Sequence, residues 1–232
     1  MMKAVLSVAM PVYNEWETVL AIIEKVLRLE IVGELVVVDD GSTDGTAEIL
    51  RSTAFDGRVR LFFHDRNRGK GAALRTAFEQ VTGEVVVIQD ADLEYDPAEF
   101  DDMIRPIRDG VADVVFGSRL SGGKPQRVYM FWHRVGNGFL TFLTNLLYNT
   151  TLTDMETCYK MFRSDVIRRI RIRSDGFSVE PEITAKIFKN RRLRVYEMPI
   201  SYYGRTYEEG KKISWKHGIG AVAALIRYRF TD

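Results

Sequence analysis

Short apolar runs alternate with amphipathic stretches through the first half of the chain. Five runs rich in β-branched residues have the length and composition of buried strands, at residues 5–12, 35–38, 59–63, 85–88 and 114–116. Four stretches with helical periodicity lie between them, at residues 17–29, 46–51, 72–81 and 97–108. This alternation predicts an α/β fold, with a Rossmann-like, mainly parallel sheet flanked by helices on both faces.

Polar side chains follow each predicted strand directly. In chain order they are Asn14 and Glu15, Asp39 and Asp40, residues 65–67, Asp90 and Asp92, and Arg119. The carboxyl ends of parallel strands meet at one edge of a sheet, where open α/β proteins bind their ligands. We therefore expect these groups to form a single site.

The pattern changes after residue 123. Residues 128–148 predict a long helix with many aromatic and large apolar side chains, and residues 214–228 hold a second apolar stretch flanked by Lys and Arg. A helix buried in the core and a helix lying in a bilayer interface both fit this composition. We expect an amphipathic helical region here and keep both interpretations open.

Charge divides the chain unevenly. The whole sequence has a net charge of +1, but residues 160–232 alone carry 17 Lys and Arg against 8 Asp and Glu. This balance indicates that the C-terminal third meets an anionic partner or presents a solvated basic face.

No segment reaches the roughly 18–20 apolar residues that span a bilayer, and there is no signal-peptide pattern. The lone Cys158 suits a reducing compartment.

The most informative acidic motif is Asp90-Ala91-Asp92, directly after the strand at residues 85–88. Two carboxylates in this position can share a hard cation such as Mg²⁺ or Mn²⁺, with substrate phosphates as further ligands. Glu94 offers a third carboxylate. The alternative is an acidic turn that caps the next helix.

Two glycine-containing loops lie at other strand ends. Residues 38–46 place Asp39 and Asp40 where a carboxylate can accept a hydrogen bond from a nucleotide base. Residues 68–71 include Lys70 between two glycines, at the predicted start of a helix where backbone amides favour an anion. Neither loop has the spacing of a dinucleotide fingerprint or a P-loop.

These motifs together resemble the inverting family 2 glycosyltransferases of GT-A fold, in the branch of polyprenyl-phosphate mannose and glucose synthases. The resemblance rests on residues 11–15, 38–46, 67–71, 90–94 and 117–119, in the order typical of the family. It implies a single domain over residues 1–232, with a nucleotide-sugar-binding half at 1–122 and an acceptor- and membrane-facing half at 123–232.

The resemblance also implies a role for particular residues. Donor binding would involve Pro11, Tyr13, Glu15, Asp39, Asp40, Lys70, Asp90, Lys211 and Lys212. The divalent metal would be held by Asp90, Asp92 and Glu94. The candidate catalytic residues are Asp92, Asp154, Arg119, Arg134 and Arg205, with the arginines near the acceptor phosphate or the donor diphosphate.

The expected reaction is transfer of a hexose from a GDP-mannose or UDP-glucose type of donor to a polyprenyl or dolichyl phosphate. The usual acidic base motif of hydroxyl-glycosylating relatives is absent, and an ionised phosphate acceptor needs no deprotonation. Transfer to a hydroxyl is the alternative, with Asp154 as the candidate base. A nucleotidyltransferase is a remote third hypothesis.

Many relatives carry C-terminal transmembrane helices, whereas this sequence shows none. We therefore expect a cytoplasmic protein, peripheral at the inner face of the cell membrane, with a membrane-protein partner as a further possibility. No nucleic-acid partner is expected, because the basic region has no recognisable nucleic-acid-binding signature.

Overall fold

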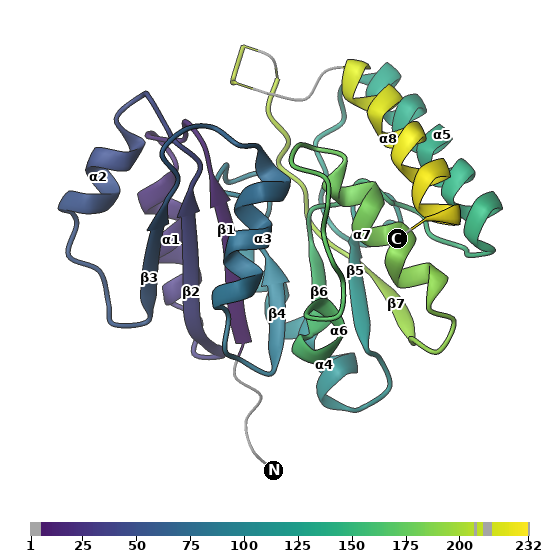
Figure 1. Cartoon of the computed structure of the whole chain (residues 1–232), viewed down its shortest axis with the longest axis horizontal. Helices are drawn as coiled ribbons and strands as arrows, with labels where there is room; N and C mark the ends of the chain where they lie inside the picture. The colour runs from purple at the N-terminus through teal and green to yellow at the C-terminus, as the bar shows by residue number, and fades with distance from the viewer. Residues whose placement is uncertain (1–5, 207, 211–214, 232) are drawn as a thin grey trace.

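The structure is a computed structural model and describes residues 6–206, 208–210 and 215–231. Within these residues seven strands form one sheet in the order β3-β2-β1-β4-β6-β5-β7 (Figure 1). Their bounds are β1 Leu6–Val12, β2 Val32–Asp39, β3 Val59–Phe63, β4 Val85–Ile88, β5 Val114–Ser118, β6 Lys160–Arg163 and β7 Val195–Pro199. All neighbouring pairs are parallel except those of β6, which runs antiparallel to β4 and β5. The predicted α/β fold with a mainly parallel sheet is confirmed.

Helices cover both faces of the sheet, which explains why the central strands are continuous apolar runs. One face packs against α1 (Val19–Leu27), α2 (Thr46–Ser52) and α4 (Phe100–Arg108), which follows the 3₁₀ turn η1 (Pro97–Glu99). The other face packs against α3 (Lys70–Gln80), α6 (Ser164–Ile167) and α7 (Val179–Lys189). The sheet thus separates two apolar cores.

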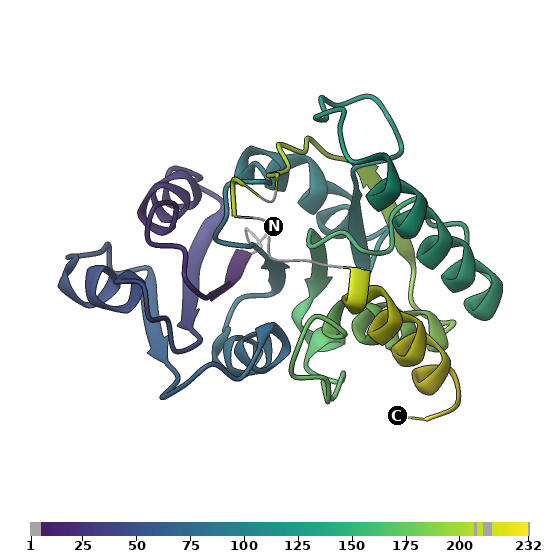
Figure 2. The ribbon, with the colours of Figure 1, turned by 90° about the horizontal axis from the view of Figure 1, so that it is seen from above.

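The two apolar helices predicted in the second half form a further layer outside α7. They are α5 (Phe131–Tyr148) and α8 (Trp215–Phe230), which lie side by side in Figures 1 and 2, and α8 packs on both α5 and α7. The Tyr148 hydroxyl donates a hydrogen bond to the Leu225 carbonyl over 2.7 Å. Helix α5 fully buries only Leu140, Thr141, Thr144 and Tyr148, so most of its aromatic side chains face outward.

The two glycines around Lys70 are required by packing of the backbone. Gly69 has a φ of +99°, and a Cβ at Gly71 would overlap the carbonyl oxygen of Ser174. The Asp175 carbonyl accepts a hydrogen bond from the Ala72 amide over 3.1 Å. The first turn of α3 is therefore pressed against the segment that precedes α7, and this contact positions Lys70 between the two halves of the sheet.

Candidate functional site

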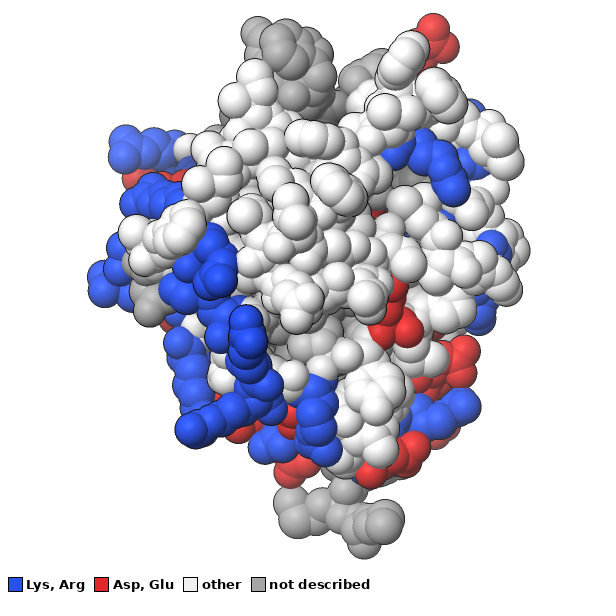
Figure 3. All heavy atoms as spheres, turned by 90° about the vertical axis from the view of Figure 1, so that its right-hand side faces the viewer, with Lys and Arg blue, Asp and Glu red and all other residues white. Residues whose placement is uncertain are grey.

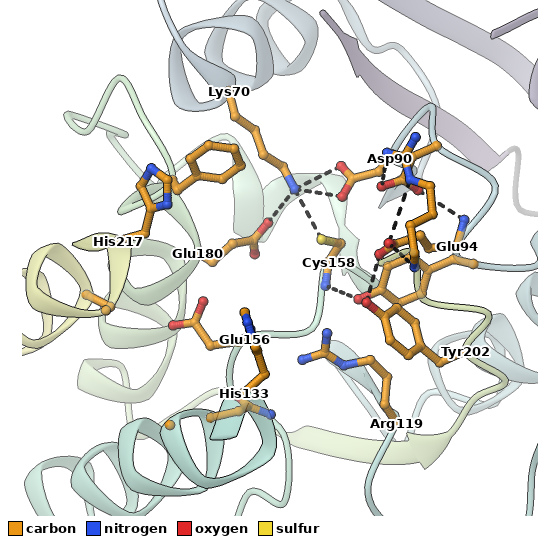
Figure 4. A pocket seen from close by; sticks show the side chains of 18 of the residues that line it. Lys70, Asp90, Glu94, Arg119, His133, Glu156, Cys158, Glu180, Tyr202 and His217 are labelled. Carbon is orange, nitrogen blue, oxygen red and sulfur yellow. Dashed lines mark hydrogen bonds and ion pairs between the residues drawn. The ribbon is translucent and has the colours of Figure 1, made fainter. Parts of the chain in front are cut away.

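A large cavity opens at the carboxyl ends of the strands, with a volume of about 1370 Å³. Its walls come from both halves of the chain. Residues after β1, β2 and β4 line one end, including Pro11, Tyr13 and Asp92. Arg119, α5 and the first turns of α8 line the other end. Most of the predicted polar strand ends meet here: the cavity is lined by Glu15, Asp40, Asn67, Asp90, Asp92 and Arg119, but not by Asn14 or Asp39. Figure 4 shows Asp90 and Arg119 around one space, together with Lys70 and Glu94.

The two neighbouring aspartates after β2 have different surroundings. The Asp40 carboxylate accepts hydrogen bonds from the amides of Arg68 and Gly69, the latter over 2.6 Å, and lies 2.6 Å from Nδ1 of His64. The backbone amides at the start of α3, which were predicted to favour an anion, therefore bind the Asp40 carboxylate. Asp39 accepts a bond from the Ser42 amide at one oxygen, while its buried Oδ1 has no hydrogen-bond donor among the described residues. Asp39 does not line the cavity, so its contact with a nucleotide base stays a prediction.

The loop after β1 is tied to the loop after β2. Asn14 has a positive φ of 51° and accepts a hydrogen bond from the Thr43 amide, while its own amide donates to the Ser42 hydroxyl. Pro11, Tyr13 and Glu15 consequently line the cavity from a fixed backbone. Glu15 forms a two-point ion pair with Arg205 at 3.0 and 3.1 Å.

Asp90 and Asp92 point into the same end of the cavity but pair with different cations. Both oxygens of Asp90 lie within 2.9 Å of the Lys70 amine. Asp92 lies 3.4 Å from the Arg205 guanidinium and accepts a bond from the Glu94 amide. The Glu94 carboxylate accepts hydrogen bonds from the Tyr202 hydroxyl and the Arg205 amide, both over 2.7 Å. Arg205 therefore closes over the acidic motif from the segment after β7.

The electrostatics of this acidic end favour a bound cation. Burial, together with the neighbouring charges of Asp90 and Glu94, raises the pKa of Asp92 to about 7. A divalent ion would relieve this repulsion, and carboxylates are suitable ligands for Mg²⁺ or Mn²⁺. Within the described residues no three potential ligands are already grouped for a metal, and the predicted third ligand, Glu94, is instead bonded to Tyr202 and Arg205. The donor set therefore fits an ion that shares Asp90 and Asp92 with ligand phosphates rather than one enclosed by protein.

Lys70 links the acidic motif to the second half of the chain. Its amine lies 3.1 Å from Glu180 on α7 and donates to the Cys158 sulfur over 3.2 Å. Burial opposes protonation of Lys70, but Asp90, Cys158 and Glu180 raise its pKa well above the ordinary value. Lys70 is therefore a permanent cation at the centre of the cavity.

Arg119 and Asp154 form a buried ion pair at the end of the cavity beside α5. Arg119 donates from Nε and a terminal nitrogen to the two Asp154 oxygens, over 2.6 and 2.7 Å. The Arg119 amide and the Asn137 side-chain amide donate two further bonds to Asp154, over 3.0 and 2.9 Å. Burial alone would raise the pKa of Asp154, but Arg119 and these hydrogen bonds hold it below the ordinary value. Asp154 is thus ionised, and both of its oxygens already accept hydrogen bonds from Arg119 and Asn137.

The remaining predicted residues are less enclosed. Arg134 is exposed on α5 and lines the cavity. Lys211 and Lys212 lie outside the described residues. The cavity is also lined by four side chains that the sequence analysis did not select, namely Asn137, Glu156, Glu180 and Tyr202. The sequence offers a signal for Asn137, a polar residue within the apolar helix α5, but none for Glu180 in the charged helix α7 or for Tyr202 in the segment after β7.

The arrangement is that of an α/β protein with an acidic ligand site at the strand ends. The model for the family described as Glycosyl transferase family 2 matches residues 7–171, and the chain belongs to this family.

Curated relatives support this assignment. The low-salt glycan biosynthesis hexosyltransferase Agl6 of Haloferax volcanii is 33% identical over 220 residues, covering 91% of this chain and 52% of the relative. A dolichol-phosphate mannosyltransferase of Pyrococcus furiosus is 26% identical, covering 88% of this chain and 58% of the relative. A dodecaprenyl-phosphate galacturonate synthase of Rhizobium johnstonii is 24% identical, covering 89% and 61%. The chain therefore spans only part of the length of these relatives.

Solved structures agree on the fold. The glucosyl-3-phosphoglycerate synthase of Mycobacterium tuberculosis, in complex with Mn²⁺, UDP and phosphoglyceric acid, superposes with a TM-score of 0.73 at 19% identity. The match covers 99% of this chain and 80% of that one. At this identity the likeness establishes the GT-A fold and nothing further.

Proposed function

We propose that this glycosyltransferase moves a hexose from a nucleotide sugar to a polyprenyl phosphate at a membrane surface, with a divalent metal and with inversion at the anomeric carbon. The observation that carries the proposal is the single cavity that joins the acidic strand ends to the space beside α5 and α8. A donor at one end and a lipid phosphate at the other would meet within it. The names of two relatives, a dolichol-phosphate mannosyltransferase and a dodecaprenyl-phosphate galacturonate synthase, support an acceptor of this class.

The donor occupies the end formed by β1, β2 and β4. Pro11 and Tyr13 line this end and would contact the nucleotide, and Asp90 and Asp92 would hold the metal on the diphosphate. The bound metal would neutralise charge that develops on the departing diphosphate. Arg205 supports the same diphosphate, because its buried Nε has no hydrogen-bond partner among the described residues. Lys70 adds a second fixed cation beside Asp90.

The acceptor phosphate approaches Arg119 and the exposed Arg134. One phosphate oxygen forms a bond to the anomeric carbon while the bond from that carbon to the diphosphate oxygen breaks, and the nucleoside diphosphate leaves with the electron pair. No proton is removed, because the acceptor is already ionised. Asp154 needs no role as a base in this reaction, and its bonds to Arg119 and Asn137 hold the arginine toward the cavity.

The outer surface of α5 and α8 fits a membrane. Its exposed apolar side chains, which we call the apolar face, are Val128, Phe131, Trp132, Val135, Phe139, Phe142, Leu146, Ile219, Ile226 and Phe230. Figure 3 shows a broad surface without charged side chains, bordered on one flank by Lys and Arg. Exposed apolar surface of this extent is typical of an interaction site, and flanking cations suit anionic lipid headgroups.

The described helices include none that is both long and apolar enough to cross a bilayer. We propose peripheral contact at the inner face of the cell membrane, with a membrane-protein partner as an additional occupant of the same surface.

A transfer assay tests the proposed reaction. Radiolabelled UDP-glucose or GDP-mannose is incubated with the protein, Mn²⁺ and vesicles that contain polyprenyl phosphate. The expected result is label in the organic phase, lost with EDTA, in a product whose anomeric configuration is opposite to that of the donor. Failure of both donors to label the lipid would contradict the acceptor assignment.

Transfer to a hydroxyl is the second candidate, and one observation favours it. Burial raises the pKa of Glu156 to about 7, and this carboxyl lines the cavity where a general base would act. Labelled product in the aqueous phase, with none in the lipid, would support this candidate instead.

A further inference from the structure

Three buried oxygen acceptors around the middle of the cavity lack hydrogen-bond donors among the described residues. They are Oδ1 of Asn137 on α5, Oε1 of Glu156 in the loop before β6, and Oε1 of Glu180 on α7. All three residues line the cavity. A buried acceptor without a donor destabilises the fold, and such groups in native proteins commonly await a ligand or water. Three from separate elements around one space therefore indicate a binding subsite.

The surrounding contacts fix how each acceptor lies. Asn137 uses its NH₂ group to bond Asp154 over 2.9 Å, which leaves its carbonyl oxygen as the unused end. Glu180 bonds Lys160 over 2.5 Å through Oε2. Its Oε1 is 3.1 Å from the Lys70 amine, an ion pair without the geometry of a hydrogen bond, so a lone pair remains available.

Glu156 lies beside Glu180 on the wall opposite the acidic motif. Figure 4 shows both carboxylates facing the same space, with Lys70 and Asp90 beyond them and Arg119 to one side. Burial raises the pKa of Glu156 although Lys160 acts to lower it. The neighbouring groups therefore do not fully offset the cost of burying a charge on this carboxyl. The mechanism proposed above assigns no step to it.

The position of these acceptors identifies what they contact. Lys70, which pairs with Asp90 of the diphosphate end, also touches Glu180, whereas Asn137 bonds the Asp154 that holds Arg119 at the acceptor end. Only the transferred group lies between the diphosphate and the acceptor phosphate. We propose that Asn137, Glu156 and Glu180 form a subsite that accepts hydrogen bonds from the hydroxyl groups of an uncharged hexose.

This subsite rests on the proposed donor site, and it narrows the class of donor from any nucleotide sugar to a nucleotide sugar with an uncharged hexose. Carboxylates and an amide carbonyl are matched to hydroxyl donors. A uronic acid would place its carboxylate against Glu156 and Glu180, where like charges repel. The subsite therefore selects nucleotide hexoses over nucleotide uronates.

Calorimetry without an acceptor separates sugar recognition from nucleotide binding. Dissociation constants are measured in Mn²⁺ for UDP-glucose, GDP-mannose, UDP and GDP with the wild type and with Glu156→Ala. The comparison uses whichever of the two hexose nucleotides the wild type binds more tightly. Glu156→Ala should bind that nucleotide with a dissociation constant about tenfold higher than the wild type, because it loses one hydrogen bond to a charged group. The dissociation constant of the matching nucleoside diphosphate should change less than about twofold.

Thermal unfolding and a control variant exclude a structural explanation. Removing an unpartnered buried carboxylate should leave the melting temperature of Glu156→Ala unchanged or raised. Glu182→Gln, on the same helix as Glu180 but with both oxygens bonded to Arg173, Ser174 and Lys186, should melt lower. It should nevertheless keep the wild-type ratio of sugar-nucleotide to nucleotide affinity.

Several results would overturn the subsite. For Glu156→Ala, they are equal losses of affinity for the sugar nucleotide and for the nucleotide, or no loss of affinity for either. For the wild type, they are no binding of UDP-glucose or GDP-mannose, or tighter binding of UDP-glucuronate than of UDP-glucose. A Glu156→Gln protein that loses kcat while its donor affinity is intact would assign this side chain to proton transfer instead. A wild type that labels no lipid but shows the predicted binding pattern would refute the acceptor alone, so the two failures are distinguishable.

Discussion

At the scale of single residues, the sequence located the acidic groups but not their partners. Asp90 and Asp92 were predictable, because an apolar strand ends directly before them and ligands gather at strand ends. The pair of Glu15 and Arg205 joins residues 190 positions apart, and no local pattern encodes it. Glu180 was missed for the same reason, since its contact with Lys70 exists only when the fold brings the first turn of α7 to the first turn of α3.

The pairing of Asp154 with Arg119 has a testable energetic consequence. Asp154→Ala should lower the free energy of unfolding by about 3 kcal/mol, because it leaves the Arg119 guanidinium buried without its counter-ion. The double variant Asp154→Ala/Arg119→Met should be less destabilised than the sum of the single changes, since no charge is left unpaired. Urea unfolding of the four proteins gives the comparison, and strictly additive losses would contradict the pairing.

At the scale of elements, the first half of the sheet was predictable and its completion was not. Four of the five predicted strands contain no charged residue and the fifth, VRLFF, contains one, and the structure contains all five. The missed strands β6 and β7 are short and include charged residues, as in the sequence of β6, KMFR. Helix α7 has Pro181 in its first turn, which hides its periodicity. These elements are specified mainly by tertiary contacts, above all the insertion of β6 between β4 and β5.

One of those contacts makes stability depend on pH. Asp113, at the start of β5, bonds the amide and guanidinium of Arg194 before β7, and these hydrogen bonds lower the pKa of Asp113 to about 2. A carboxyl with a lowered folded-state pKa contributes stability above its ordinary pKa near 4, and this contribution is lost as the pH falls toward 2. Asp113→Asn should therefore cost about 1 kcal/mol at pH 7 and almost nothing near pH 2. Denaturant unfolding across this pH range measures the difference, which would stay constant if the ion pair contributed nothing.

At the scale of the whole molecule, the structure separates a polar ligand edge from an apolar outer surface. The sequence indicated that residues 128–148 and 214–228 were apolar helices but left a core and an interfacial interpretation open. Helix α5 buries a narrow stripe on α7 and α8 and leaves Trp132 78% exposed and Phe142 64% exposed. Amphipathic periodicity cannot distinguish the two cases when aromatic residues occupy nearly every face. The packing excludes a fully buried α5, and contact with a membrane stays a proposal.

Membrane binding through the apolar face has a direct test. Phe142→Ser/Leu146→Ser should weaken binding to vesicles containing anionic lipid at least about tenfold, because two large side chains no longer enter the interface. The melting temperature should be nearly unchanged, since both side chains are mostly exposed. Val111→Ser, at an exposed apolar residue before β5, is the matched control and should bind vesicles like the wild type. Equal binding by all three proteins in vesicle sedimentation would refute this surface.

The metal-assisted donor site is tested most directly by calorimetry of UDP and GDP with the wild type and Asp92→Ala, in Mn²⁺ and in EDTA. For the nucleotide that binds, Mn²⁺ should strengthen wild-type affinity at least about tenfold, because the ion bridges the carboxylates and the diphosphate. Asp92→Ala should bind that nucleotide with the same, weaker affinity in both conditions. A variant that keeps the full gain from Mn²⁺, or a wild type that shows no gain, would contradict the assignment of Asp90 and Asp92 to the metal.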